Sequence, residues 1–343
     1  MSRPAAPPAI SVLMPVHDAA PTLSAAVESI RDQTETDWEL VAVDDGSTDG
    51  SLEALRDRAR GDARIRVLER PHRGVVDALN AGLAAARGPL IARMDADDIS
   101  LPERLARQRR HLDAHPEVGL VACRVRFAGD ERRAAGYARH VAWTNGLGSH
   151  EAIALARFVE SPLAHPSVMF RRELIERHGG YRPGDFPEDY DLWLRWLEAG
   201  VRMEKLPEVL LVWRDSPARL SRRDRRYAPD AFHRVKAGHL ARWLARHNPR
   251  HPEIVLWGAG RVTRRRARLL EAEGVVVAAY VDIDPRKIGL AIAGRPVIAP
   301  SALPAPGVCF VVAAVGSVGA REQIERALIC AGYRAGRDYI LAG

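Results

Sequence analysis

Three aspartates stand close together in the segment Arg93-Met94-Asp95-Ala96-Asp97-Asp98, directly after a short apolar run. Three carboxylates within four positions repel one another, and a cation must offset that repulsion. Asp95 and Asp97 are two residues apart, so they would point to the same side of an extended strand end. Hard oxygen ligands in this arrangement suit Mg²⁺ or Mn²⁺, which bind through one or two carboxylates and substrate phosphates. The alternative is an acidic turn that caps a helix beginning near Leu101.

A second acidic pair, Asp44 and Asp45, follows the apolar segment Trp38–Val43 and precedes the string Gly46-Ser47-Thr48-Asp49. A buried aspartate at this position can accept a hydrogen bond from the imide N–H of a nucleobase. A strand-to-helix turn explains the capping residues of the string, but it does not explain the paired aspartates. Because ligands of open α/β sheets bind beyond the carboxyl ends of the strands, we expect both acidic segments to border one crevice.

Strand-like and helix-like segments alternate in the part of the chain that must position these aspartates. Short apolar segments predict strands at Ile10–Val16, Trp38–Val43, Ile65–Leu68, Leu90–Met94 and Val118–Phe127. A helical period of apolar residues predicts helices at Thr22–Gln33, Ser51–Ala59, Val75–Ala86 and Leu101–His115. This alternation is typical of a mostly parallel sheet wound with helices, an α/β fold. From 129 to 161 the pattern is lost, so we expect loops with one short helix near Glu151–Phe158.

The alternation restarts after a segment with two prolines, residues 248–252. Gly258-Ala259-Gly260 follows a predicted strand and opens a predicted helix, which is the context of a dinucleotide-binding turn. Thr263 stands where the third glycine of that motif belongs, and the acidic pair Asp282 and Asp284 follows the next strand near the position of a ribose-binding carboxylate. Binding of a nucleotide or phosphate, and a packing or docking role, both stay open for this region. We predict domains at 1–247 and 253–343, joined by a linker at 248–252.

The charge of the chain is concentrated in one stretch. The formal net charge is +7, and between Arg214 and Arg246 ten basic residues face three aspartates. This stretch is either a solvated helix face or a patch that docks anionic lipid headgroups at a membrane surface. Nucleic acid is not expected as a partner, because no recognised nucleic-acid-binding module accompanies the charge.

Several features predict a cytoplasmic protein. The basic stretch adds the prediction of peripheral contact with the inner face of the membrane. The longest apolar run, Val308–Val315, is less than half of the roughly 20 residues that a membrane-spanning helix needs. Residues 1–9 lack the apolar stretch of a secretion signal. The three cysteines lie far apart without CxxC spacing, which fits reduced thiols.

Five blocks, in this order and spacing, give the chain a resemblance to the family 2 glycosyltransferases of the GT-A fold. The blocks are Ser11-Val12-Leu13-Met14-Pro15-Val16-His17-Asp18, Val43-Asp44-Asp45-Gly46-Ser47-Thr48-Asp49, Ala78-Leu79-Asn80-Ala81-Gly82, Arg93-Met94-Asp95-Ala96-Asp97-Asp98 and Glu188-Asp189-Tyr190-Asp191-Leu192-Trp193. The resemblance covers residues 8–245. It implies inverting transfer of a sugar from a nucleoside diphosphate donor, with uridine as the default base. The region after 252 is similar to small Rossmann-like domains found beside sugar-modifying enzymes.

The resemblance also implies roles for residues near the donor. Pro15, Val16 and Asp44 would hold the base, Asp45 would lie nearby, and Arg73 would contact the donor. The family usually has Tyr-Asn where this chain has the pair His17-Asp18.

For the diphosphate, the resemblance makes Asp95 and Asp97 the pair of a DxD motif, one directed to the ribose and one to the metal. His165 lies in a further block that resembles the family, Ala164–Arg172. It would be a third metal ligand or an acceptor contact, and a structural histidine is the alternative.

A general base is expected in the cluster Glu188-Asp189-Tyr190-Asp191. At about 100° per residue, Asp189 shares its helix face with Leu192 and Trp193. A carboxylate beside an indole is partly desolvated, which raises its pKa toward a useful range. We therefore choose Asp189, with Glu188 and Asp191 as alternatives. The alternative explanation is that these acidic residues only stabilise the N-terminus of a helix.

These observations predict a metal-dependent glycosyltransferase that uses a saccharide or lipid-linked hydroxyl acceptor in cell-surface polysaccharide or glycoconjugate synthesis. The alternative is a nucleotide-sugar-binding protein without transfer activity, whose C-terminal domain regulates or docks. A nicotinamide-dependent oxidoreductase is disfavoured, because no Tyr-x-x-x-Lys pair occurs in the sequence.

Overall fold

The computed structural model describes residues 6–216, 219–317 and 319–343. Part of the N-terminal segment 1–9 considered above therefore lies outside the described residues. Contacts between residues divide the chain into two compact units. The first contains the chain up to Ile153 together with Leu163–Gly184 and Arg195–Arg223, and the second contains Ala154–Pro162, Asp185–Leu194 and Asp224–Gly343. The domain limits expected from the sequence stay a prediction, since this grouping describes packing within the folded chain.

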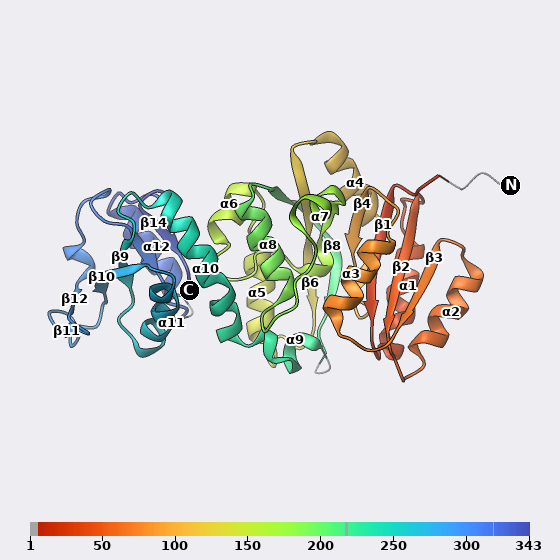
Figure 1. The fold of residues 1–343 in the computed structure, drawn as a ribbon, viewed down its shortest axis with the longest axis horizontal. Coiled ribbons are helices and arrows are strands. Elements are labelled where there is room, and N and C mark those ends of the chain that lie inside the picture. Colours follow the sequence, from red (N-terminus) through yellow and green to blue (C-terminus); the bar gives the residue numbers. More distant parts are fainter. Residues whose placement is uncertain (1–5, 217–218, 318) are drawn as a thin grey trace. The chain divides into compact units, whose positions relative to one another are not determined.

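The first unit is built on an eight-stranded sheet with the strand order β3-β2-β1-β4-β7-β6-β8-β5. Its strands are β1 (Ile10–Val16), β2 (Trp38–Asp45), β3 (Ile65–Arg70), β4 (Leu90–Arg93), β5 (Ile99–Ser100), β6 (Val118–Ala128), β7 (Met169–Arg171) and β8 (Arg202–Arg214). Figure 1 shows β1, β2 and β3 side by side, and these three strands and β4 are parallel. The strand β7 is antiparallel to β4 and β6, so the sheet is mixed rather than parallel throughout.

Helices follow the first strands of this sheet, as the alternating pattern predicts. The helices of the N-terminal half are α1 (Ala20–Arg31), α2 (Ser51–Gly61), α3 (Val75–Ala85) and α4 (Arg104–Ala114). In α1, the apolar positions Leu23, Val27 and Ile30 recur at helical spacing and are fully buried in the core of the sheet. Burying such a side chain stabilises the fold by about 1.5–3 kcal/mol. The central strands β1 and β2 are buried along nearly their whole length, which explains their continuous apolar runs.

The prediction of loops with one short helix between 129 and 161 was wrong in one respect, because the region contains two helices. This region and the next contain α5 (Ala135–Asn145), α6 (His150–Ala156), η1 (His165–Ser167), α7 (Glu173–His178), α8 (Glu188–Glu198) and α9 (Leu220–Arg223). The helix α5 was not expected because it buries only Val141 and Thr144, which is too few residues to produce a helical period.

The second unit carries a smaller, six-stranded sheet with the order β11-β12-β10-β9-β13-β14. Its elements are η2 (Arg225–Tyr227), α10 (Pro229–His247), β9 (Glu253–Trp257), α11 (Arg261–Ala272), β10 (Val276–Val281), β11 (Ala291–Ile292), β12 (Arg295–Ile298), η3 (Pro300–Ala302), β13 (Val311–Ala313), α12 (Ala320–Cys330) and β14 (Tyr339–Leu341). All its neighbouring strands are parallel except β11 and β12, and the order reverses beside β9, as in doubly wound α/β sheets. The predicted fold class, a large wound sheet with a second, smaller α/β sheet, is confirmed. Within the described ranges, no helix has both the length and the apolar character that crossing a bilayer requires.

A buried lysine ties α10 to the rest of the second unit. Lys236 is 4% exposed, and its Nζ donates to the carbonyl oxygens of Phe158 at 2.7 Å and Ala342 at 2.8 Å. A third bond reaches the carbonyl of Val159 at 3.2 Å. The lysine thus joins three segments that are far apart in the sequence.

We expect Lys236→Ala to lower the free energy of unfolding by about 2–4 kcal/mol, because buried carbonyl groups lose their donor. Equilibrium denaturation in urea measures this change. Arg234→Ala is the matched control, since this arginine of the same helix is exposed and its bond to the carbonyl of Asp185 is weak, at 3.4 Å. Equal stability of the two variants would contradict the structural role of Lys236.

Candidate active site

The acidic segments lie at one edge of the large sheet, where its parallel strands end. In the register of the sheet, Val16 of β1 is paired with Asp44 of β2, and Leu13 of β1 is paired with Arg93 of β4. The carboxyl ends of β2 and β4 therefore flank the end of β1 on either side. At the usual spacing of neighbouring strands, their ends are on the order of 10 Å apart.

A cluster of three carboxylates follows β4. Oxygen atoms of Asp95, Asp97 and Asp98 all lie within 4.8 Å of one another. Asp98 is fully buried, whereas Asp95 and Asp97 are half-buried. The strand ends at Arg93, and a turn follows in which Asp98 N–H donates to the carbonyl of Asp95 at 3.4 Å. The turn, rather than the extended strand end expected from the spacing, brings all three side chains together.

Two arginines face these carboxylates. Arg93 Nη2 lies 2.6 Å from Asp95. Arg219 lies 3.4 Å from Asp95, 3.6 Å from Asp97 and 3.2 Å from Asp98. Its guanidinium also stacks on the indole of Trp213, with 4.3 Å between the guanidinium carbon and the ring centroid. Sequence reasoning missed Arg219, which stands 124 residues after Asp95 in the basic stretch and carries no local signal for this contact.

The electrostatics of the cluster favour an additional positive charge. Burial raises the pKa of Asp98 well above its usual value, and Asp95 and Asp97 add to this, although Arg219 opposes it. Burial likewise raises the pKa of Asp97 against the effect of Arg219. At Asp95, by contrast, burial is outweighed by Arg93 and Arg219, and the pKa is lowered. The nearby arginines thus do not fully offset the burial of Asp97 and Asp98 and the repulsion among the three carboxylates.

The residues present fit a hard divalent cation. The Oδ2 atom of Asp98 is buried without a hydrogen-bond partner among the described residues. An oxygen-only donor set with an unsatisfied buried oxygen suits Mg²⁺ or Mn²⁺ better than a transition metal that prefers nitrogen or sulfur.

The histidine predicted as a third ligand lies near this cluster. His165 is 9% exposed, and its Nε2 lies 2.8 Å from the hydroxyl oxygen of Tyr181. Burial lowers the pKa of His165 well below its usual value, Arg93 adds to this, and Asp95 opposes it. The imidazole is therefore neutral near pH 7, as a metal ligand must be. Its ring nitrogens are not part of the close carboxylate group found among the described residues, so the ligand role stays a prediction.

The two aspartates at the end of β2 have different surroundings. Asp45 accepts the N–H groups of Arg73 and Gly74, both at 2.8 Å, and so holds the loop that precedes α3. Asp44 is 1% exposed, and its Oδ2 accepts from Ser47 N–H at 3.1 Å. Its Oδ1 is buried without a hydrogen-bond partner among the described residues. Asp44 therefore has a vacant acceptor, as a base-binding role requires.

The other residues expected near the base lie at the same edge. Pro15 and Val16 end β1, and Val16 is buried while Pro15 is half-buried. Arg73 contacts Asp45 through its backbone N–H, and the residue is exposed. The structure thus places its side chain at the surface of the loop.

The three carboxylates predicted as general bases begin α8. Glu188 is 3% exposed, and both of its oxygens accept from the hydroxyl group of Tyr227, at 2.9 and 2.7 Å. Asp191 is 4% exposed. Asp189 is the half-buried member of the set, and its Oδ1 accepts from Tyr190 N–H at 2.7 Å. The geometry thus leaves Asp189 the most accessible of the three.

The glycine turn of the second unit is hydrogen-bonded to Asp282 of the same unit. Ala259 N–H donates to Asp282 Oδ2 at 3.0 Å, and Lys287 Nζ lies 3.0 Å from the same oxygen. The other oxygen of Asp282 accepts from Asp284 N–H at 2.9 Å. The carboxylate that would bind a ribose in a dinucleotide fold is therefore engaged within the chain.

The fold is that of a known class of protein. The large sheet wound with helices is like the sheet of GT-A glycosyltransferases. The structure of Staphylococcus aureus TarS 1-349 in complex with UDP-GlcNAc aligns with a TM-score of 0.55 at 17% identity, covering 77% of this chain and 71% of that chain. At this identity the likeness shows the fold alone.

Sequence comparison gives the family. Residues 11–179 match the family model described as glycosyl transferase family 2. The amylovoran biosynthesis glycosyltransferase AmsE of Erwinia amylovora is 34% identical over 190 residues, which cover 55% of this chain and 69% of AmsE. The uncharacterized protein y4gI of Sinorhizobium fredii is 31% identical over 250 residues, 71% of this chain, and the chain spans only 26% of that protein's length. The chain belongs to the family 2 glycosyltransferases.

Proposed function

We propose that the chain transfers a sugar from a nucleoside diphosphate donor to a hydroxyl group of a saccharide or lipid-linked acceptor, with inversion at the anomeric carbon. Its place in the family supports glycosyl transfer, and the relative AmsE is named for the biosynthesis of a polysaccharide, amylovoran. We extend this to the synthesis of cell-surface polysaccharide or glycoconjugate.

One observation carries the donor assignment. The vacant Oδ1 of Asp44 and the carboxylate cluster after β4 lie at the same sheet edge, on either side of β1. The acceptor at Asp44 fits an imide N–H, as in uracil. The cluster, at the end of the strand on the other side of β1, fits the diphosphate end of the same molecule through a divalent ion. That ion, Mg²⁺ or Mn²⁺, would stabilise the charge that develops on the departing phosphate.

The acceptor hydroxyl must lose its proton as it attacks. We assign this step to Asp189, whose carboxylate is the accessible one at the start of α8. The acceptor oxygen then forms the new bond to the anomeric carbon while the bond from that carbon to the diphosphate breaks. A general base at this position contributes about 10²–10⁴-fold to the rate.

Membrane contact through Arg214–Arg246 and a cytoplasmic location stay proposals. Several cations of this stretch face partners within the chain. Arg219 contacts the carboxylate cluster, Arg222 lies 2.5 Å from Asp215, and Lys236 is buried. Fewer charges are therefore available for anionic lipid than the sequence alone suggests.

A thermal-shift screen of UDP, GDP, CDP and ADP with and without Mn²⁺ tests the donor assignment, because a ligand that binds only the native state raises its stability. We expect UDP with Mn²⁺ to give the largest shift, and a transfer assay with the matching UDP-sugars to give product. Binding without turnover on any acceptor would favour the alternative, a nucleotide-sugar-binding protein.

We expect Asp44→Asn to weaken UDP binding by about 10–100-fold, the value of a hydrogen bond to a charged group. In an asparagine an NH₂ group replaces one of the two carboxylate oxygens, so an acceptor is lost either at the position that faces Ser47 N–H or at the position assigned to the imide N–H. Calorimetry with UDP measures the loss. CDP is the matched control ligand, since cytosine has no imide N–H and its binding should not weaken. An equal loss for both nucleotides would contradict base recognition by Asp44.

A further inference from the structure

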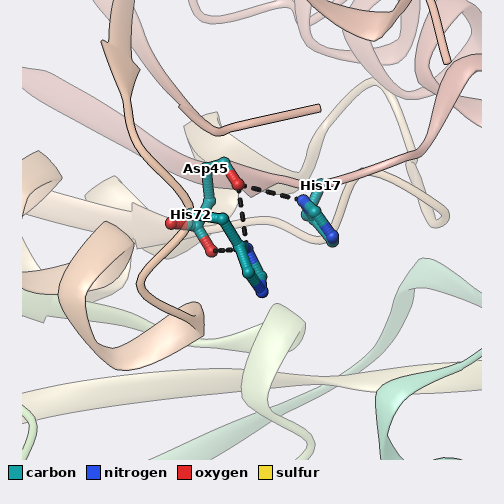
Figure 2. Close-up of side chains that lie close together, drawn as sticks. All are labelled: His17, Asp45 and His72. Atoms are coloured by element: carbon teal, nitrogen blue, oxygen red, sulfur yellow. Dashed lines mark hydrogen bonds and ion pairs between the residues drawn. The ribbon is translucent and has the colours of Figure 1, made fainter. Parts of the chain in front are cut away.

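A second group of side chains that could hold a metal ion is distinct from the carboxylate cluster, with one residue after β1, one at the end of β2 and one in the loop after β3. It consists of His17, Asp45 and His72, whose ligand atoms lie within 4.8 Å of one another (Figure 2). The Nδ1 atoms of both histidines lie 3.0 Å from the backbone carbonyl oxygen of Asp45. His72 Nδ1 also lies 2.9 Å from Asp45 Oδ2. The two imidazole rings are stacked, with centroids 4.1 Å apart.

The backbone on both sides of this group is held in place. Asp18, which follows His17, donates its N–H to Ser47 Oγ at 3.1 Å and accepts from Thr48 N–H at 2.8 Å. These bonds join the loop after β1 to the loop after β2. The backbone next to His17 is therefore held by the loop after β2.

The approach of His72 depends on a glycine. Gly46 has a φ of +72°, and a Cβ at this position would lie 2.7 Å from the backbone nitrogen of His72. Only a residue without a side chain permits this contact. The next two N–H groups, of Arg73 and Gly74, donate to the carboxylate of Asp45. The loop before α3 is thus anchored where it presents His72 to Asp45.

The spacing of these atoms is close to that of ligands around a tetrahedral zinc ion. Zn²⁺ bound at about 2.0–2.1 Å places neighbouring ligand atoms roughly 3.3 Å apart. His72 Nδ1 and Asp45 Oδ2 are two such ligand atoms, and their separation of 2.9 Å needs an opening of only a few tenths of an ångström. The ligand atoms of all three residues lie within 4.8 Å of one another. The carboxylate is 4% exposed, whereas the imidazoles are 59% and 41% exposed, so the ligands are open to a solvent ion.

We propose that His17, His72 and Asp45 form a binding site for a borderline divalent ion of the Zn²⁺ class, distinct from the oxygen-only cluster of Asp95, Asp97 and Asp98. Two imidazoles and one carboxylate suit Zn²⁺, Co²⁺ or Cu²⁺, whereas three carboxylates suit Mg²⁺ or Mn²⁺. The chain therefore separates two metals by ligand chemistry. The proposal concerns metal binding alone and does not depend on the proposed transfer reaction.

Calorimetric titration of the metal-free full chain with ZnCl₂, in excess Mg²⁺ to occupy the carboxylate cluster, tests the proposal. We expect one Zn²⁺ to bind per chain. His17→Ala and His72→Ala should each weaken binding by at least about 10–100-fold, the loss seen even for residues that only support metal ligands. Asp97→Asn, which alters the other cluster, should leave Zn²⁺ binding unchanged.

His115→Ala is the matched control, because His115 also packs against another histidine, His111, with ring centroids 4.6 Å apart. This variant should bind Zn²⁺ as the unaltered chain does. Electron paramagnetic resonance of Cu²⁺ on the unaltered chain adds a readout that needs no variant to fold. Coupling to two imidazole nitrogens supports the site. Absence of Zn²⁺ binding, coupling to fewer nitrogens, or affinity that both histidine variants retain would overturn it.

Discussion

We expect Asp97→Asn to lower the rate of sugar transfer by about 10²–10³-fold or more, the cost of removing one preorganised group that stabilises developing charge. The same variant should be at least as stable as the unaltered chain when no divalent ion is present. The carboxylates of Asp95, Asp97 and Asp98 repel one another, and burial still raises the pKa of Asp97 and Asp98 beside Arg219, so removing one charge relieves repulsion. The test is a transfer assay together with thermal unfolding, each with and without Mn²⁺.

The pattern of the two measurements separates this role from a structural one. Mn²⁺ should raise the melting temperature of the unaltered chain and have little effect on the variant. Asp113→Asn on α4 is the control, because this exposed carboxylate lies 3.7 Å from Arg109 in a surface pair worth at most about 1 kcal/mol. If Asp97→Asn kept near-normal turnover and the same response to Mn²⁺, the proposal that the cluster binds the metal would be contradicted.

Asp189→Asn should reduce transfer by about 10²–10⁴-fold while leaving nucleotide binding intact, because an amide cannot take the proton of the acceptor hydroxyl. Single-turnover transfer and calorimetry with UDP measure the two properties on one sample. Loss of transfer with unchanged UDP binding indicates that Asp189 acts in the chemical step and not in donor affinity.

Asp185→Asn is the matched control for this change. Asp185 lies four residues before Asp189, is exposed, and pairs with Arg225 at 3.2 Å. It should transfer sugar at the normal rate. Near-normal turnover of Asp189→Asn would contradict this role and leave Glu188 and Asp191 as candidates for the base. A test of Glu188 by Glu188→Gln would also remove an oxygen that accepts from the hydroxyl group of Tyr227.

Local sequence pattern predicted most of the elements that carry the site. The apolar period of α1 and the continuous apolar runs of β1 and β2 follow from what each segment must bury. The pattern failed at α5, which buries few residues. A helix that buries so few residues is decided by its neighbours, because its own sequence does not specify a buried face.

Only the structure shows that neighbouring carboxylates have different surroundings. Asp44 and Asp45 are equivalent in the sequence, yet Asp45 holds the loop before α3 and Asp44 keeps a vacant acceptor. The three carboxylates at the start of α8 likewise differ in burial. The difference arises because the surroundings of a side chain depend on the path of distant loops.

The sequence by itself determined the α/β fold class, the family, and the two acidic strand ends, since these depend on residues that are close together in the chain. Only the tertiary structure decided that Arg219 lies against the carboxylates, and that His17 and His72 meet over Asp45 from positions 28 and 27 residues away. The physical reason is that strand order and turn geometry set such contacts, and neither leaves a pattern in neighbouring residues.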